Sequence, residues 1–151
     1  MNIELSPIGT VKNSRKAAFD DNWENVISEI ELADYIPSEA FDGISDFSHL
    51  EIIYYFDKVI SPNIIFSGHP RENPTYPSVG IFSQRKKDRP NRIGICTVQL
   101  LEHYHRTIIV KYLDAIDGTP VIDIKPVFKE YQPKGEIKQP FWVADLMKNY
   151  W

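Results

Sequence analysis

The chain has 151 residues, of which 42% are hydrophobic and 25% charged, and its 8 Tyr, 8 Phe and 3 Trp add aromatic mass. This composition can close one core, which excludes a wholly disordered chain, and the length argues against a second domain of ordinary size. No apolar run is long enough to span a bilayer, so we expect no membrane partner. Because the first residues lack a signal-peptide pattern and Cys96 is the single cysteine, we expect a cytoplasmic protein without a disulfide.

The net charge of -4 alone argues against a nucleic-acid partner, whose electrostatic footprint is usually basic. The charge is unevenly distributed, however: residues 20–57 contain 11 acidic side chains and no Lys or Arg, which leaves +7 on the remainder. The densest basic run spans residues 85–92, shortly after Arg71. Such a run is typical of a solvated turn, or of an anion site in which Arg pairs two oxygens of a phosphate or carboxylate.

Strand patterns dominate the chain, and turn residues separate them. In chain order, the predicted strands span residues 3–11, 26–32, 50–59, 79–85, 93–101, 106–113 and 119–124. The run 50–59 is almost continuously apolar and aromatic, which predicts a strand buried on both faces. A helical turn is expected at 37–41, a long irregular loop at 62–77, and a helix at 141–150 after a linker at 132–139.

Six or seven short strands with few helices favour a small closed β-barrel with a C-terminal helix, because closure removes exposed strand edges. A β-sandwich is the alternative. We expect residues 1–130 to form the barrel domain and residues 131–151 to form the linker and the C-terminal helix.

The sequence contains no dinucleotide-binding, phosphate-loop, nucleophile-elbow or zinc-protease motif. His103 and His105 could share one face of a strand, but no third ligand stands near them in sequence, so we expect a plain hairpin and no metal site. Cys96, within an apolar strand, is expected to be a small buried side chain rather than a nucleophile.

Two segments combine turn residues with functional groups. Residues 89–94 contain Pro90, which fixes φ, and Gly94, which admits the close approach of a ligand. Residues 114–126 place three carboxylates around the Asp117-Gly118 pair. This pair predicts a tight turn, and the carboxylates would suit ribose hydroxyls or an amino group; the residues alone favour neither interpretation.

Five motifs occur in the order found in one family. They are Pro7–Val11, Asp46–Leu50, Val79–Phe82, Arg89–Asn91 with Ile93-Gly94, and Asp117–Pro126. Over residues 3–130 the chain thereby resembles the TrmO family, also called TsaA-like. The resemblance implies a small β-barrel that binds S-adenosylmethionine (SAM) as a homodimer and methylates N6 of threonylcarbamoyl-adenosine beside the tRNA anticodon.

The same resemblance implies the cofactor residues, with Arg85 the leading candidate and Ile95 offering its backbone to adenine. The full cofactor set is Asn22, Trp23, Asp57, Lys58, Arg85, Ile95, Asp114, Ala115, Ile116 and Asp117. The substrate set is Arg71, Arg89, Asn91 and Arg92, of which Arg89 and Arg92 would meet an incoming phosphate.

The catalytic residue stays unassigned, with His69, Tyr76 and Asp57 as candidates for a general base by loop position. Many family members have prolines where this chain has Lys87 and Arg92, so its basic loop is more cationic and less rigid. The tRNA-modifying members also carry a further C-terminal domain, whereas we expect a short form here. Methylation of a small molecule and a non-enzymatic SAM-binding module therefore remain the alternatives.

Overall fold

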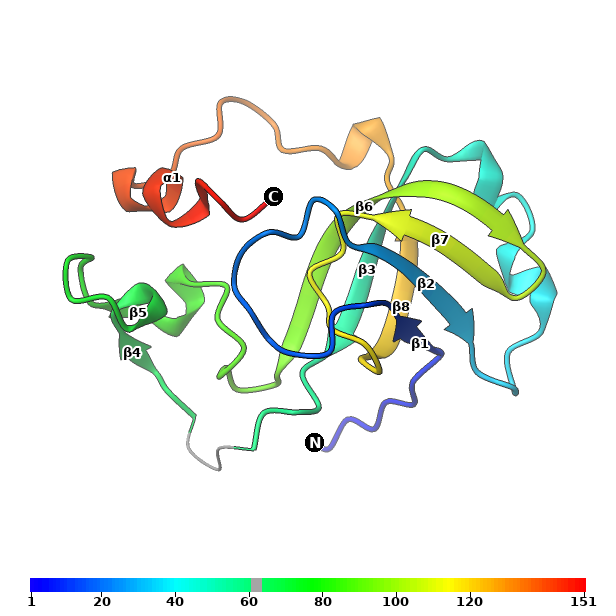
Figure 1. Ribbon diagram of the computed structural model, residues 1–151, viewed down its shortest axis with the longest axis horizontal. Coiled ribbons are helices and arrows are strands. Elements are labelled where there is room, and N and C mark those ends of the chain that lie inside the picture. Colours follow the sequence, from blue (N-terminus) through cyan, green and yellow to red (C-terminus); the bar gives the residue numbers. More distant parts are fainter. Residues whose placement is uncertain (61–63) are drawn as a thin grey trace.

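The computed structural model describes residues 1–60 and 64–151. Within them, six antiparallel strands close into a barrel in the order β1-β2-β7-β6-β3-β8, with β8 pairing back onto β1 (Figure 1). These strands are β1 (Gly9–Lys12), β2 (Ile27–Leu32), β3 (His49–Tyr55), β6 (Ile93–Tyr104), β7 (Thr107–Lys111) and β8 (Pro120–Pro126). The closed β-barrel expected from the sequence is confirmed.

The core fills the barrel interior with side chains that alternate along the strands, most regularly in β3. In β3, Leu50, Ile52 and Tyr54 point inward and are at most 2% exposed, while the residues between them are only partly buried. Each fully buried aliphatic side chain of this kind contributes roughly 1.5–3 kcal/mol. The expectation of a strand buried on both faces is therefore wrong, because a single-walled barrel has one interior.

The strand predicted over residues 79–85 is largely wrong. β5 (Val79–Gly80) pairs with β4 (Ser67–Gly68) outside the barrel, and a 3-10 turn follows at Ile81–Ser83. Ile81 is buried but Phe82 is 80% exposed, so this apolar run anchors a loop at one residue. The predicted loop 62–77 is also less irregular than expected, since it contains β4 and a 3-10 turn at Pro70–Glu72; its first two residues lie outside the described residues.

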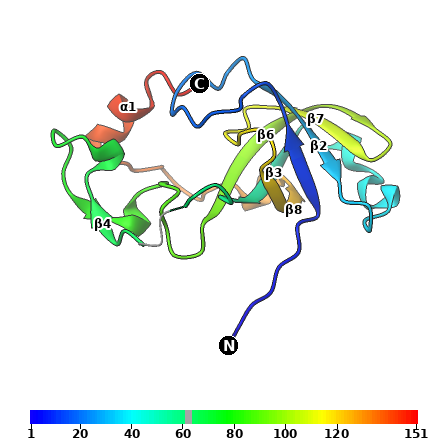
Figure 2. The ribbon, with the colours of Figure 1, turned by 60° about the horizontal axis from the view of Figure 1, so that its bottom comes forward.

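The first predicted strand, 3–11, is shorter in the structure. Regular pairing begins at Gly9, while Ile3 and Leu5 are 79% and 55% exposed. Pro7 lacks the N–H that a longer ladder would need. Figure 2 shows the N-terminal segment running away from the barrel.

The turns and the C-terminal helix complete the described chain. The helical turn expected at 37–41 is present as a 3-10 turn at Ser38–Phe41, and further 3-10 turns span Ile44–Asp46 and Lys129–Tyr131. Residues 132–140 are exposed and lead into α1 (Phe141–Met147), three residues shorter than predicted. After α1 the chain turns back toward the segment between β1 and β2 (Figure 1).

Candidate functional site

The strand registers bring several connecting segments to one end of the barrel. β1, β3 and β7 end there and β2, β6 and β8 begin there, as the pairs Ile27↔Lys111 and Tyr55↔Ile93 show. The segments after β1, β3 and β7 and the residues at the start of β6 therefore meet around this end. Most members of the predicted cofactor set lie on these segments.

The segment before β8 contains the tight turn predicted from the Asp117-Gly118 pair, which is confirmed. The Thr119 N–H donates to the Ile116 carbonyl at 3.1 Å, and Gly118 has a φ of 83°. A side chain is disfavoured at this positive φ, so glycine is required here. The Thr119 hydroxyl donates to the same carbonyl at 2.7 Å and tightens the turn.

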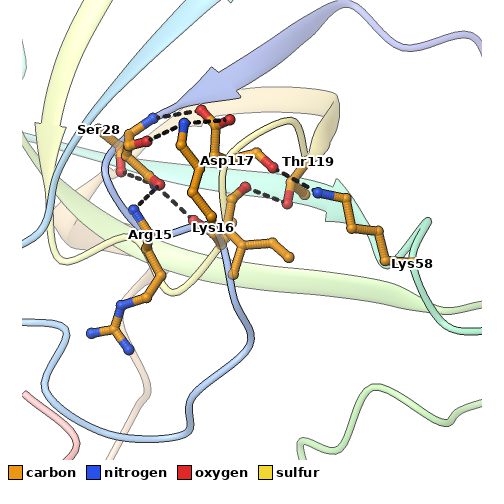
Figure 3. A network of polar contacts seen from close by, with 9 residues as sticks. Arg15, Lys16, Ser28, Lys58, Asp117 and Thr119 are labelled. Carbon is orange, nitrogen blue, oxygen red and sulfur yellow. Dashed lines mark hydrogen bonds and ion pairs between the residues drawn. The ribbon is translucent and has the colours of Figure 1, made fainter.

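Asp117 lies at the centre of a polar network that joins three segments (Figure 3). Its carboxylate pairs with Lys16 at 2.7 Å and accepts the Asn13 N–H at 3.0 Å, while its backbone carbonyl accepts the Lys58 ammonium at 3.0 Å. The Lys16 ammonium, followed by the Asn13 N–H, lowers the pKa of Asp117 below its ordinary value of 3.8. The structure thus places Lys58 beside Asp117.

Asn13 also holds the segment before β8 in place through its side chain. Its side-chain amide donates to the Ser28 hydroxyl at 2.9 Å and to the Ala115 carbonyl at 2.8 Å. Ser28 is fully buried, so this bond also satisfies a polar group inside the protein. Nothing in the sequence singled out Asn13, because one polar residue after a strand carries no local pattern.

Asp114 is held by two tyrosine hydroxyls. Tyr54 donates to Oδ1 at 2.7 Å and Tyr150 donates to Oδ2 at 2.5 Å. Burial, and then the charge of Asp114, raise the pKa of both Tyr54 and Tyr150. Both phenols are therefore protonated donors at neutral pH.

Gly94 makes the Tyr54 position possible. A Cβ at residue 94 would overlap the Tyr54 ring, which packs across the strand partner Gly94. The close approach expected at Gly94 is thus made by a side chain of this protein, and its consequence is the orientation of Asp114.

Arg85 and Ile95, two members of the predicted cofactor set, are in direct contact. The Arg85 guanidinium donates to the Ile95 carbonyl at 2.6 Å, and its charge lowers the pKa values of Tyr150 and Cys96 against the larger effect of burial. Cys96 is 6% exposed and donates to the Tyr112 carbonyl at 2.9 Å. The expectation of a small buried side chain is confirmed, and burial raises the Cys96 pKa, which disfavours the thiolate.

Asn22 and Trp23 are hydrogen-bonded to the C-terminal residues, one of which, Tyr150, also contacts Asp114. Their N–H groups donate to the carbonyls of Asn149 and Tyr150 at 2.9 and 2.8 Å. Asn22 has a φ of 65°, and its carbonyl accepts the Arg15 guanidinium at 2.6 Å. The same guanidinium lies 4.4 Å from the centre of the Trp23 ring, which is a cation–π contact.

A pocket of about 450 Å³ opens beside these residues. It is lined by Arg15, Phe19, Asp20, Asp21, Asn22 and Arg71. Arg71 binds Asp21 with both terminal nitrogens, at 3.2 and 2.7 Å. Arg71, predicted from the sequence to meet substrate, therefore lines the same pocket as Asn22 of the predicted cofactor set.

The arginines of the basic loop 84–92 donate hydrogen bonds to backbone carbonyls and so help to hold the loop in place. Arg89 donates to the Gln84 carbonyl at 3.1 Å, and Arg92 donates to the Val59 carbonyl at 2.9 Å. Lys87 and Asn91 are exposed at its surface. Arg71 itself binds Asp21 at the pocket, and the residue after it, Glu72, pairs with Lys86 of this loop at 3.5 Å.

The base candidates take different positions. Asp57 is exposed just after β3, and the His69 ring donates from Nδ1 to the Tyr76 carbonyl at 2.7 Å. The Tyr76 hydroxyl donates to Asp145 at 2.5 Å, and this bond raises the Tyr76 pKa. Tyr76 therefore anchors α1 and is poorly suited to accept a proton.

His103 and His105 form a hairpin rather than a ligand pair. His103 Nε2 donates to the His105 carbonyl at 3.1 Å, and its ring packs against Phe41 at 5.4 Å. Within residues 1–60 and 64–151, no group of three or more His, Cys, Asp or Glu side chains is arranged to hold a metal ion. In the same part of the chain, no helix has the length and hydropathy to cross a bilayer.

The structure is thus a closed six-stranded antiparallel barrel with carboxylates, arginines and aromatic rings gathered at one end. Residues 15–132 match the family described as the tRNA-methyltransferase O N-terminal domain. The chain belongs to this family, and the family resemblance of the sequence is confirmed.

Curated relatives of two kinds are similar to the chain. An S-adenosyl-L-methionine-binding protein of Archaeoglobus fulgidus is 33% identical over 86% of this chain and 90% of its own length. A probable S-adenosyl-L-methionine-binding protein of Methanothermobacter thermautotrophicus is 34% identical over 89% of this chain and 97% of its own. The tRNA (adenine(37)-N6)-methyltransferase of Escherichia coli is 35% identical, over 63% of this chain and 42% of the enzyme.

Solved structures agree on the fold. A crystal structure of TrmO superimposes with a TM-score of 0.75 at 24% identity, covering 92% of this chain and 64% of the other. TrmO from Pseudomonas aeruginosa gives 0.75 at 23% identity, over 94% and 62%. The chain thus spans less than two thirds of these structures, and the likeness establishes the barrel architecture.

Proposed function

We propose that this protein is a SAM-dependent methyltransferase that methylates N6 of threonylcarbamoyl-adenosine beside the tRNA anticodon. The observation that carries the proposal is the family match over residues 15–132. The barrel adds support, because segments distant in sequence meet where the cofactor residues are expected. On this proposal residues 1–130 are the cofactor-binding domain, and residues 131–151 are its linker and helix.

The chemistry of the residues present fits SAM. SAM combines a sulfonium and an ammonium with a carboxylate, a ribose diol and an adenine. Asp114 and Asp117 would accept from the ribose or ammonium, Arg85 would bind the carboxylate or the adenine side, and the backbone near Ile95 would meet the adenine. A pocket of about 450 Å³ lies at Asn22, the one member of the predicted cofactor set that lines it.

SAM, when bound, would supply a methyl group already activated by its positive sulfur. The protein's contribution is alignment, which in intramolecular models is worth roughly 7–11 kcal/mol. The two phenols on Asp114 and the network on Asp117 keep these carboxylates oriented before a ligand arrives.

The basic loop and Arg71 are proposed to meet the nucleic acid. Arg89 and Arg92 shape the loop, Asn91 and Lys87 project from it, and a cationic loop of this kind attracts phosphate. We further propose a cytoplasmic homodimer, for which Ile93, Ile95 and Leu101 on the outer side of β6 offer an exposed apolar strip.

The test is mass analysis of tRNA nucleosides from a strain that lacks this protein, together with transfer of labelled methyl to its tRNA in vitro. The proposal expects loss of the N6-methylated threonylcarbamoyl-adenosine and its restoration by the purified protein. An unchanged nucleoside profile would overturn the tRNA assignment.

A SAM-binding module without transferase activity is the second candidate. The relatives that this chain covers over 90% and 97% of their length are named as binding proteins, whereas the named E. coli methyltransferase is longer. SAM binding without methyl transfer to tRNA or to a small-molecule acceptor would favour this candidate.

A further inference from the structure

The last three residues, Asn149–Trp151, form what we call the C-terminal strap. The strap binds the segment between β1 and β2 by backbone hydrogen bonds. The Asn149 and Tyr150 carbonyls accept the Asn22 and Trp23 N–H groups at 2.9 and 2.8 Å. These bonds help to hold Asn22 at its positive φ of 65°, a conformation that costs free energy in a residue other than glycine.

The Tyr150 side chain extends from the strap to the segment before β8. Its hydroxyl donates to Asp114 at 2.5 Å, and its ring lies 5.9 Å from the Arg71 guanidinium carbon. The Trp151 ring packs edge-on against Tyr112 at 5.6 Å, which keeps the strap against the barrel. One residue thus connects two segments of the predicted cofactor set that are about ninety positions apart in sequence.

The connection of the strap to the barrel along the chain is weak. Residues 132–140 are exposed throughout, and α1 has seven residues, of which Trp142 is the buried one. The strap is therefore positioned by its own contacts more than by the chain that precedes it. Its contacts with Asp114, Asn22 and Trp23 are the ones that reach predicted cofactor residues.

We propose that Tyr150 is a positioning residue of the SAM site: through its hydroxyl and its backbone carbonyl, it fixes Asp114 and the Asn22–Trp23 segment at the spacing the cofactor needs. This inference rests on the proposed function. A carboxylate has about four lone-pair positions, so Asp114 held by Tyr54 and Tyr150 can still accept a ligand donor. Tyr150 acts on the cofactor through Asp114 rather than by chemistry of its own.

The Tyr150→Phe variant tests the inference, with SAM binding measured by calorimetry. Loss of one hydrogen bond to a charged group should weaken SAM binding by about tenfold or more. Tyr76→Phe is the matched control, because it also removes a 2.5 Å phenol–carboxylate hydrogen bond. The acceptor of that bond is Asp145 in α1, the helix just before the strap. We expect Tyr76→Phe to bind SAM within about twofold of wild type, because its hydroxyl bonds Asp145 and not a residue of the predicted cofactor set.

A mutant cycle shows whether Tyr150 acts through Asp114. In Asp114→Asn, removal of the Tyr150 hydroxyl should have little further effect on SAM affinity. In the ligand-free protein, hydrogen exchange at the Asn22 and Trp23 amides should be faster in Tyr150→Phe than in wild type. These amides report the positioning without any methyl transfer.

The failures are distinguishable. If wild type does not bind SAM, the proposed function fails. If wild type binds SAM but Tyr150→Phe binds equally well, or Tyr76→Phe loses as much affinity, the positioning role is wrong. Additive losses in the cycle, or unchanged amide exchange, would also contradict it.

Discussion

Two charged loops differ in how the protein holds them. The 114–119 segment is fixed by distant partners: Tyr54, Tyr150 and Asn13 reach it across 60, 36 and 104 positions of the sequence. The 84–92 loop is held through its own cations instead: Arg89 and Arg92 donate to the carbonyls of Gln84 and Val59, 5 and 33 positions away, while Lys87 is exposed. The acidic segment is thus oriented by the whole fold, which suits a small ligand needing fixed geometry. The basic loop suits a large anionic partner that needs charge more than precision.

The largest expected effect is the loss of stability when the Asp114 carboxylate is removed. In Asp114→Ala, the buried Tyr54 hydroxyl loses its 2.7 Å carboxylate acceptor and keeps only the backbone carbonyl of residue 114 at 3.4 Å, so the free energy of unfolding should fall by about 2–3 kcal/mol. Urea denaturation measures the change. Asp88→Ala is the control in the basic loop, where a 3.9 Å pair with Lys86 predicts a loss below about 1 kcal/mol. Equal losses in the two variants would contradict the difference between the loops.

Loss of one exposed charge in the basic loop should affect tRNA and not SAM. Lys87→Ala is expected to weaken tRNA binding a few-fold and to reduce the salt slope by about 1, because one phosphate contact is lost. Filter binding across a salt series, with SAM calorimetry alongside, measures both. Lys129→Ala, on the turn after β8, serves as the control. A salt slope that stays at the wild-type value would remove Lys87 from the tRNA surface.

The smallest expected effect concerns the pH dependence of stability. Lys16 and the Asn13 N–H lower the pKa of Asp117 in the folded protein below its ordinary value of 3.8. The ionised carboxylate therefore stabilises the folded state fully at pH values above 3.8. This contribution should disappear as the pH falls through the lowered pKa. Asp117→Asn should therefore be less stable than wild type at pH 7 and converge with it at low pH. Thermal unfolding from pH 2 to 7 tests this expectation, and Lys16→Met should reproduce part of it; parallel curves would contradict it.

The sequence predicts the barrel well because alternation is a local pattern. The β2, β3, β6, β7 and β8 strands all fall on predicted runs, within a few residues. The run 79–85 failed for a physical reason: it is apolar enough for a strand, but Gly80 ends the short β4–β5 pair and Ile81 alone is buried. Pairing partners, which the sequence does not display, decide whether such a run becomes a barrel strand.

The candidate site divides in the same way. The Asp117-Gly118 turn and the Arg85–Ile95 and Lys58–Asp117 contacts fall on residues chosen from the sequence. The sequence did not single out Tyr54, which lies in an apolar run, or Tyr150, which lies at a helical spacing. Their shared contact with Asp114 is visible only in the folded chain. Local motifs therefore locate the site, whereas the groups that orient it come from distant positions.

The central claim is a SAM site at the end of the barrel where Arg85 and Asp114 lie. Calorimetric titration of SAM into wild type and Arg85→Ala tests it most directly. We predict saturable binding of one SAM per chain to wild type, and binding weakened by about tenfold or more in Arg85→Ala, because a charge-assisted contact is lost. Absence of heat with wild type, or equal affinity in the variant, would contradict the claim.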